Sequence, residues 1–321
     1  MGGRFNILRL PRVHIFDQLL LEEALYRTSS ENWLLQNEGG GKRIPAIVLG
    51  ISGKPSQWVN VEAAEKNRVP MIRRYTGGGT VYIDHNVVFS SFILDKTLCG
   101  VPPFPKEMMK WSGNFYGRVF GTERFRQQAD DYAVLPRESL VKRGQGGGED
   151  PSEAEWRKVG GNAQAFAREK VAHHTSFLWK LNDVAMQTYL PPPPREPKYR
   201  EGRSHRDFLC GLEDMGGEGG DGRAFFGSPD AFLDRVKREA TSFAEERGCT
   251  VQECEWTEKT RDEMRGVVSD FLSNERTRGL RATWVVDRDG KRLDDSSPEV
   301  ASLGLAKLAK QNSEISASLF S

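Results

Sequence analysis

One stretch of twelve residues carries most of the information in this sequence: RRYTGGGTVYID, residues 73–84. It places two arginines before three consecutive glycines and continues with residues typical of a β-strand. Three glycines in a row carry no Cβ, so the backbone N–H groups of this turn can approach an anion closely. Arg74 adds a planar fork of donors for a phosphate or carboxylate, and Thr76 adds a hydroxyl. We therefore predict an anion-binding turn; a hairpin loop with two solvated arginines is the alternative if the stretch stood alone.

A second segment that could contribute to a reaction is RKVGGNAQ, residues 157–164. A lysine at position 158 that faces a closed pocket can neutralise acyl-phosphate oxygens, although a solvated lysine before a turn is the more common case. His173 and His174 follow on a predicted strand, where neighbouring side chains point to opposite faces. They cannot share one metal, and we expect one of them to face the core. With three further histidines in the chain, we predict no zinc site.

Two other glycine patterns fail as nucleotide-binding motifs. GISGKPS, residues 50–56, lacks a glycine five positions before Gly53, and Pro55 stands where a Walker loop has its hydroxyl residue. No GxGxxG follows a predicted strand, which argues against a Rossmann site.

Composition narrows the class of protein. Lys+Arg 46 against Asp+Glu 45 gives a net charge of +1, so no global basic field would attract nucleic acid. No apolar run approaches the roughly 20 residues that span a bilayer, so we predict no membrane segment. The N-terminus moves into an amphipathic helix pattern and shows no clear targeting peptide, which leaves a cytoplasmic or mitochondrial location open. Four cysteines without a CxxC pair favour a reducing compartment.

The spacing of apolar residues predicts both helices and strands. The predicted helices are residues 16–26, 60–68, 106–120 and 229–247. The predicted strands are residues 44–51, 80–83, 87–94, 132–135, 158–167, 171–181 and 282–286, with a tight connection at 84–86. Low-complexity stretches at 144–152, 190–197 and 215–222 are expected to be surface insertions, and the tail from residue 296 partly disordered. Short consecutive strands with flanking helices favour an α+β fold with a mixed, mostly antiparallel sheet.

These segments together resemble the lipoate–protein ligase A family. RRYTGGGTVYID, the Asp130–Asp131 pair before a strand, KVGGNAQ and HHTSFL are similar to motifs that occur in this order in the family. VLGISGKPSQWVN upstream and RSHRDFL downstream extend the resemblance to about residues 12–250. It implies the α+β fold that these ligases share with biotin ligases and octanoyl transferases.

The resemblance also implies a reaction and roles for individual residues. Lys158 matches the lysine that contacts both the acyl carbonyl and the phosphate of an acyl-adenylate. The positions around the adenylate and the acyl head are Arg74, Thr76, Gly77, Gly78, Gly79, Thr80, Val81, Tyr82, Asp131, Asn162 and Ala163, with His174 and Arg73 as further candidates. The implied reaction joins lipoate and ATP to lipoyl-AMP, with Mg²⁺ accompanying ATP, and then acylates a lysine. The implied partners are apo lipoyl-carrier domains, those of 2-oxoacid dehydrogenase E2 subunits and the glycine cleavage carrier protein.

Departures from the family pattern leave other functions open. Ile83 stands where the family usually has histidine, and Thr175 where it often has glycine. We divide the chain into a catalytic domain, residues 1–248, and a short C-terminal extension or reduced accessory region, residues 249–321. One alternative is an octanoyl or lipoyl transferase that moves the acyl group between carrier proteins without ATP, with Cys210 as the cysteine nearest a family segment. A second is a non-catalytic lipoyl-binding protein.

Overall fold

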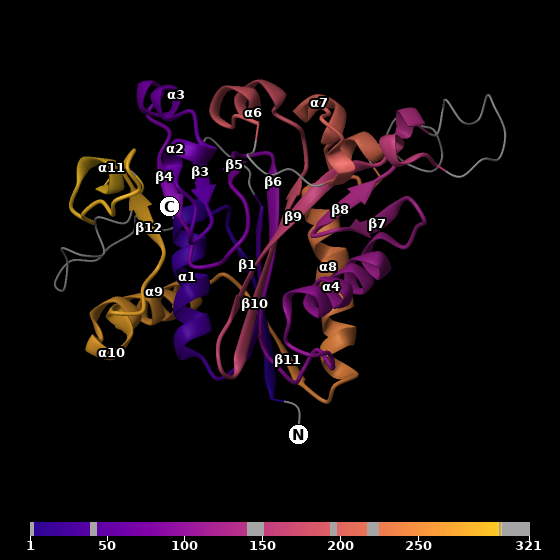
Figure 1. Ribbon diagram of the computed structural model, residues 1–321. Coiled ribbons are helices and arrows are strands. Elements are labelled where there is room, and N and C mark those ends of the chain that lie inside the picture. Colours follow the sequence, from indigo (N-terminus) through magenta and orange to yellow (C-terminus); the bar gives the residue numbers. More distant parts are fainter. Residues whose placement is uncertain are drawn as a thin grey trace.

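The computed structural model describes residues 3–38, 44–139, 151–192, 198–216, 225–301 and 303, and its strands form two sheets (Figure 1). In spatial order the eight-stranded sheet contains β11 (Thr250–Cys254), β1 (Arg4–Leu10), β2 (Asn32–Glu38), β6 (Val87–Asp95), β10 (Lys170–Leu178), β9 (Arg157–Phe166), β8 (Asp131–Val134) and β7 (Phe125–Gln128). The four-stranded sheet contains β12 (Trp284–Val286), β4 (Met71–Arg73), β3 (Ala46–Leu49) and β5 (Val81–Ile83). Among the described strands, the pairs β1–β2, β1–β11 and β3–β4 are parallel and the rest are antiparallel. The predicted mixed, mostly antiparallel α+β fold is confirmed.

Helices flank both sheets. The longer ones are α1 (Ile15–Thr28), α4 (Pro105–Phe120), α8 (Pro229–Glu245) and α9 (Glu258–Ser273). The shorter ones are α2 (Pro55–Trp58), α3 (Val61–Lys66), α6 (Asp183–Tyr189), α7 (His205–Phe208), α10 (Glu275–Arg278) and α11 (Pro298–Ala301). The four predicted helices correspond to α1, α3, α4 and α8.

The helix α1 is enclosed between the two sheets. Its N-terminal half packs with β3 of the small sheet and β6 of the large sheet, around Phe16 and Leu19. Leu21 and Leu25, on its other side, pack with α9 and the large sheet. The His14 side chain accepts a hydrogen bond from the Phe16 N–H and caps the first turn, which otherwise leaves its N–H groups unpaired. Enclosure on several sides explains why α1 carries little polar surface.

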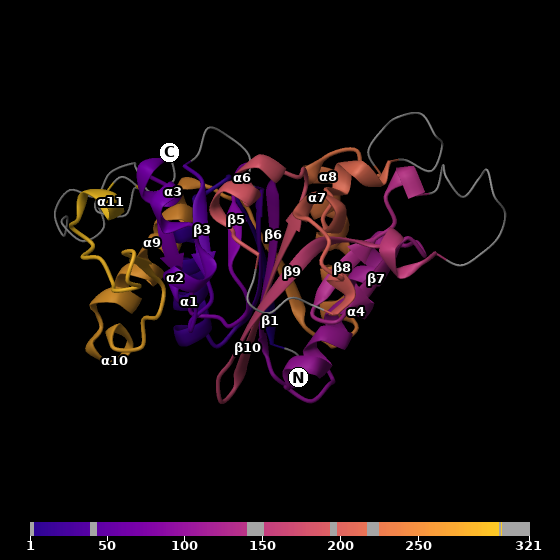
Figure 2. The ribbon, with the colours of Figure 1, turned by 45° about the horizontal axis from the view of Figure 1, so that its top comes forward.

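The opposite face of the large sheet is covered by α4 and α8 (Figure 2). Aromatic rings fill this layer, and Phe177 of β10 packs edge-on against Phe232 of α8. The Ser228 side chain accepts from the Ala231 N–H at the start of α8, and Gly248 follows its end at φ +71°. Both residues suit the ends of this helix, because serine caps N-termini and glycine tolerates positive φ.

Three features differ from the sequence predictions. Residues 4–10 form a strand that was not predicted. The tight connection at residues 84–86 does not close a hairpin: β5 belongs to the small sheet and β6 to the large one. The strands β2, β4, β7 and β11 and the helices α6 and α9 were not predicted. The predicted insertions fall largely outside the described residues, at 144–150, 193–197 and 217–222, and so does most of the tail.

The segment after residue 248 contributes to both sheets. β11 pairs in parallel with β1, and β12 pairs with β4. Between them, α9 packs on α1. The Glu23 carboxylate of α1 accepts the backbone N–H groups of Ala282 and Thr283 at 2.8 and 2.9 Å. The division of the chain at residue 248 stays a prediction. Within the described ranges, no helix combines the length and apolar character that a membrane crossing requires.

Candidate active site

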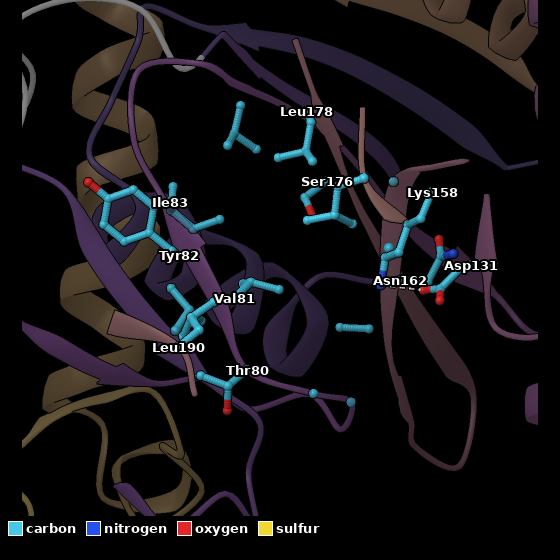
Figure 3. Close-up of a pocket in the computed structure, with 18 of the residues that line it drawn as sticks. Thr80, Val81, Tyr82, Ile83, Asp131, Lys158, Asn162, Ser176, Leu178 and Leu190 are labelled. Atoms are coloured by element: carbon cyan, nitrogen blue, oxygen red, sulfur yellow. Dashed lines mark ion pairs between the residues drawn. The ribbon is translucent and has the colours of Figure 1, made fainter. Parts of the chain in front are cut away.

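A cavity of about 590 Å³ opens between the two sheets. Strand β5 supplies one wall, β9 and β10 supply the opposite wall, and residues of α6 and α7 also line it. Figure 3 shows Val81, Tyr82 and Ile83 on one side and Lys158 and Asp131 on the other. Two segments that are separate in the sequence, residues 73–84 and 157–164, therefore both line one space, an arrangement that the family resemblance implies.

Lys158 forms an ion pair with Asp131 on the cavity wall, with 2.8 Å between Nζ and Oδ1. A β-bulge produces this geometry: Asp131 pairs with Gly161, but Ala133 pairs with Lys158, so β9 contains one extra residue. Lys158 and Gly161 would lie on opposite faces of a regular strand, and the extra residue brings them to the same face. Gly161 borders this ion pair: a Cβ there would lie 3.5 Å from Nζ, at ordinary van der Waals distance.

A tyrosine that the sequence reasoning missed holds the other oxygen of this carboxylate. The Tyr199 hydroxyl donates to Asp131 Oδ2 at 2.7 Å. Burial, and then the neighbouring Asp131 charge, raise the pKa of Tyr199 far above its ordinary value, so this hydroxyl stays protonated. Asp131 is thus held from two sides, and its orientation fixes the position of the Lys158 ammonium.

Arg74 is buried and braces the glycine turn from inside. Its Nη2 donates to the carbonyl oxygens of Gly77 at 2.9 Å and Gly79 at 2.8 Å, and Nε also donates to Gly77. Burial lowers the pKa of Arg74 to about 10. The alternative of two solvated arginines is therefore wrong. Arg74 lines the cavity, but these donors serve the backbone of the turn.

Glycine is required at position 78 of this turn. Its φ is +100°, a conformation that residues with a Cβ rarely adopt, and a Cβ would lie 2.8 Å from Arg74 Nη2. Gly50, in the segment before α2, contacts the Gly78 carbonyl so closely that a Cβ there would lie 2.2 Å away. A Cβ on Gly79, in contrast, would meet no atom within 4 Å. Gly79 lines the cavity, so the backbone is open to a ligand at that position.

Most of the predicted site residues line the cavity. They are Arg74, Gly78, Gly79, Thr80, Val81, Tyr82, Asp131, Lys158, Asn162, Ala163 and His174. Thr76, Gly77 and Arg73 are not among the lining residues. The buried Thr76 accepts the Ile51 N–H through its carbonyl, while the Gly77 N–H donates to the Gln164 carbonyl across to β9. Arg73 donates to the Ile51 and Gly290 carbonyls and so ties the turn to the C-terminal segment.

The two neighbouring histidines point to opposite faces of β10, as predicted. His173 is buried in the aromatic layer, and its pKa is lowered to about 3, first by burial and then by His174. His174 lines the cavity, and its Nδ1 lies 3.0 Å from Glu22 Oε2 and 2.9 Å from Ser91 Oγ. His174 is thus the single imidazole of this pair that a ligand can reach.

Part of the cavity wall is apolar. Ile83, in the position where the resembled family usually has histidine, joins this surface. Further apolar lining side chains from α1, β3, β5, β6 and β10 are Ile15, Leu19, Val48, Val81, Val87, Phe89 and Leu178, and others come from α2, α6 and α7. Burying a methylene of a hydrocarbon chain against such a surface is favourable by about 0.8 kcal/mol. The cavity therefore combines an apolar compartment with a polar wall around Lys158.

Cys210 does not belong to the cavity wall. The side chain is buried in the large core cluster, and burial raises the pKa of its thiol well above the ordinary range. Its backbone N–H donates to the Lys158 carbonyl at 3.0 Å. A thiol that is buried and protonated is a poor nucleophile, and this weakens a transfer mechanism through Cys210.

Arg200 and His205 also line the cavity, and neither was predicted as a site residue. His205 belongs to the RSHRDFL segment, whose similarity to the family was noticed without a role for this side chain. Across the described ranges, no three histidine, cysteine or acidic side chains are grouped so that they could hold a metal ion.

Comparison with known proteins shows the family to which this chain belongs. The model of the lipoyl protein ligase A/B catalytic domain matches residues 15–226, so the chain belongs to this family. An inactive lipoate–protein ligase 2 of Plasmodium falciparum is 28% identical over 257 residues, which are 65% of this chain. The chain spans 64% of the length of that relative.

Solved structures agree on the fold. The lipoate protein ligase of an archaeal lipoylation system, from Thermoplasma acidophilum, superposes with a TM-score of 0.59 at 19% identity, over 86% of this chain and 96% of that one. A lipoate-protein ligase A bound with ATP superposes with a TM-score of 0.53 at 18% identity, over 88% of this chain and all of the other.

Proposed function

We propose that this chain is a lipoate–protein ligase, which activates lipoate with ATP and transfers the lipoyl group to a lysine of a carrier domain. The observation that carries the proposal is the Lys158–Asp131 pair, which holds an ammonium on the wall of a cavity that is otherwise partly apolar. The family membership and a structural neighbour that binds ATP support the same reaction.

The proposed activation step forms an acyl-adenylate. A lipoate carboxylate oxygen attacks the α-phosphorus of ATP, a C–O–P anhydride forms, and pyrophosphate leaves with the electron pair of the broken bond. Negative charge grows on the phosphoryl oxygens during this step. A fixed ammonium at Lys158 and the open backbone at Gly79 are already oriented when the charge develops, which is the most effective form of electrostatic stabilisation.

The transfer step needs no nucleophilic side chain on the enzyme. The neutral ε-amine of the carrier lysine attacks the anhydride carbonyl, a C–N amide bond forms, AMP departs with the electron pair of the broken C–O bond, and the nitrogen gives its extra proton to water. The apolar wall would hold the lipoyl chain so that its carbonyl stays beside Lys158. The partner is an apo lipoyl domain, in line with the archaeal ligase that was studied with its E2 lipoyl domain.

Magnesium would enter with ATP. Mg²⁺ is usually bound by one or two carboxylates together with substrate phosphates. Asp130 fits this requirement, because it lines the cavity and is exposed, whereas both oxygens of Asp131 contact Lys158 and Tyr199. Bound there, the ion would screen the phosphate charges.

Two rival functions make different demands on the structure. A transferase without ATP would need a donor acyl carrier and, through Cys210, a thiol that the fold buries. A non-catalytic binding protein is suggested by the inactive relative, but this chain has a paired lysine on its cavity wall.

The test is a mass measurement on an apo lipoyl domain. Incubation with the full chain, ATP, Mg²⁺ and lipoate is expected to add one lipoyl group, and omission of ATP is expected to abolish the addition. Addition from octanoyl- or lipoyl-carrier without ATP would favour the transferase. Binding of lipoate without any addition would favour the non-catalytic protein.

A further inference from the structure

Arg73, the first arginine of the RRYTGGG motif, has no part in the mechanism above. It is the last residue of β4, and it is not among the residues that line the cavity. Its guanidinium instead joins two backbone carbonyls from distant parts of the chain: Nη1 donates to Ile51 at 3.0 Å and Nη2 to Gly290 at 3.1 Å. A guanidinium suits this task, because its donors point in fixed directions within one plane. Arg73 therefore connects the segment after β3 with the segment after β12.

The segment after β3 supports the glycine turn from outside. The Ile51 N–H donates to the Thr76 carbonyl at 3.0 Å, so the residue whose carbonyl Arg73 holds also contacts the turn. Gly50 lies so close to the turn that a Cβ there would be 2.2 Å from the Gly78 carbonyl oxygen. A displacement of residues 50–51 would therefore be felt directly by the backbone of the turn.

A turn after β12 fixes the other end of the Arg73 contact. β12 pairs with β4, with Trp284 opposite Arg73, and the two strands lie side by side in Figure 1. The chain then turns at Gly290, whose φ is +79° and whose N–H donates to the Asp287 carbonyl at 3.0 Å. A Cβ on Gly290 would lie 2.8 Å from Arg73 Nη2 and 3.1 Å from Pro55 Cδ. Glycine at position 290 therefore allows the close contact with Arg73.

We propose that Arg73 is a positioning residue, which holds residues 50–51 against the glycine turn and so keeps the open backbone at Gly79 oriented toward a nucleotide phosphate. The inference rests on the proposed function, since that function supplies the phosphate. Arg74 braces the turn from inside, and Arg73 braces it from outside through Ile51. Donors bind charge best when they are oriented in advance. Loosening of the turn therefore weakens phosphate binding, although no donor to the ligand is removed.

The chain offers a matched control for each substitution. Gly290→Ala disturbs the Arg73 contact from the opposite side. Its control is Gly227→Ala, because Gly227 has a similar φ of +77° but a Cβ there would meet no atom within 4 Å. The control for the charge is Arg288→Gln, which removes a cation from the same turn after β12; Arg288 pairs with Glu65 at 3.5 Å, and both side chains are about half exposed. Adenosine is the control ligand, because it lacks the phosphates of ATP.

The experiment is calorimetric titration of ATP with Mg²⁺, and of adenosine, into the full chain. We expect Arg73→Gln and Gly290→Ala each to raise the Kd of ATP roughly three- to tenfold, the range for one net hydrogen bond. The double variant should lose little more than the larger single effect, since both changes act through one contact. Arg73→Lys, which can still donate to one carbonyl, should restore part of the affinity. Gly227→Ala and Arg288→Gln should change the Kd of ATP less than about twofold, and adenosine affinity should stay the same in every variant.

The Kd separates positioning from a loss of stability. A variant that is only less stable has fewer folded molecules, which lowers the measured number of binding sites and leaves the Kd of those sites unchanged. Wild-type ATP affinity in folded Arg73→Gln, an equal loss for adenosine, an equal loss in Gly227→Ala, or additive losses in the double variant would each overturn the inference. If Arg73→Gln does not fold, Gly290→Ala against Gly227→Ala carries the same test.

The inference and the proposed function can fail separately. ATP binding that follows this pattern without lipoyl transfer would refute the proposed function and leave the positioning role of Arg73 standing. Lipoyl transfer by the wild-type chain together with unchanged ATP affinity in Arg73→Gln would do the reverse.

Discussion

Lys158 is held before any ligand arrives, because Asp131 pairs with it and Tyr199 in turn holds Asp131. This arrangement determines what a substitution does. Removal of Lys158 leaves the Asp131 carboxylate with the Tyr199 hydroxyl, so no buried charge loses its last partner. Removal of the Tyr199 hydroxyl leaves the Lys158–Asp131 ion pair intact, but the Asp131 carboxylate then loses the hydrogen bond that fixes its orientation. The two substitutions therefore separate catalysis from positioning.

Lys158→Ala is expected to reduce lipoylation of the carrier by a factor on the order of 10²–10³, the usual loss when one preorganised charge donor is removed. The free energy of unfolding should fall by only about 1 kcal/mol, since a partly exposed ion pair contributes little. Lys158→Arg should rescue poorly, because a wide planar guanidinium does not replace a compact ammonium. Carrier mass at saturating ATP and lipoate, with thermal melts alongside, checks both statements. A near wild-type rate in Lys158→Ala would show that the assignment is wrong.

Tyr199→Phe is expected to lower kcat about tenfold while leaving adenosine affinity unchanged, because it disturbs the position of Lys158 and not the nucleotide pocket. Stability should fall by roughly 1–2 kcal/mol for the lost hydrogen bond to a carboxylate. Tyr189→Phe is the control, since Tyr189 stacks on Tyr82 beside the cavity without lining it. Equal losses of kcat in both variants would contradict the prediction that Tyr199 positions Lys158.

At the scale of elements, the glycine turn between β4 and β5 could be recognised from sequence, but its internal bracing could not. Arg74 was predicted to face a ligand, whereas several of its donors bind carbonyls of the turn itself. The sequence pattern indicates that a glycine turn follows Arg74. Which carbonyl oxygens accept from its buried guanidinium depends on the folded shape of that turn. The bulge in β9 was equally invisible, because it depends on the register with β8.

Gly79→Val is expected to fold normally and to lose most adenylate formation. A Cβ at this position meets no protein atom within 4 Å, so the side chain would occupy ligand space alone. Gly78→Val is the contrasting variant: its φ of +100° and the contact with Arg74 predict loss of stability as well. Pyrophosphate exchange with lipoate and ATP measures the step. Full exchange by a folded Gly79→Val protein would mean that the turn does not touch the substrate.

At the scale of the whole molecule, helices and buried strands were predictable where apolar spacing is regular, as in α1 and β6. Sheet membership was not, since β1 and β11 pair between residues about 250 positions apart in the sequence, Arg4 with Thr250 for example. Short strands such as β7 carry mixed polar residues and gain their structure from the neighbouring strand. The local sequence pattern therefore predicts individual helices and strands, but it does not predict which distant strands pair in a sheet.

Buried His173 makes stability depend on pH. Its folded pKa of about 3 lies below the unfolded value near 6.5, so the unfolded chain binds the additional proton. The contribution of His173 to the free energy of unfolding is complete above pH 6.5 and is lost as the pH falls from there toward 3. Denaturant unfolding between pH 7 and 4 should show a slope up to about 1.4 kcal/mol per pH unit steeper in the wild type than in His173→Gln. Parallel pH profiles for the two proteins would contradict this.

The last prediction concerns the segment after residue 248, which we divided from the catalytic domain on sequence grounds. In the fold it pairs β11 along β1, and it buries Met264, Val268 and Phe271 in the cluster that also holds the outer side of α1. It also supplies two backbone donors to Glu23, whose pKa is raised by burial and which would lose these partners.

A chain that ends at residue 248 is therefore expected to be insoluble or to melt without cooperativity, because it exposes the apolar side of α1 and leaves a buried carboxylate without its backbone donors. A chain that ends at residue 303 is the control, since it keeps all of these contacts, and it should melt within a few degrees of the full protein. Solubility, circular dichroism and thermal melts compare the two. A soluble 1–248 fragment with a cooperative melt would establish residues 1–248 as a domain of their own and reduce the C-terminal segment to an appendage.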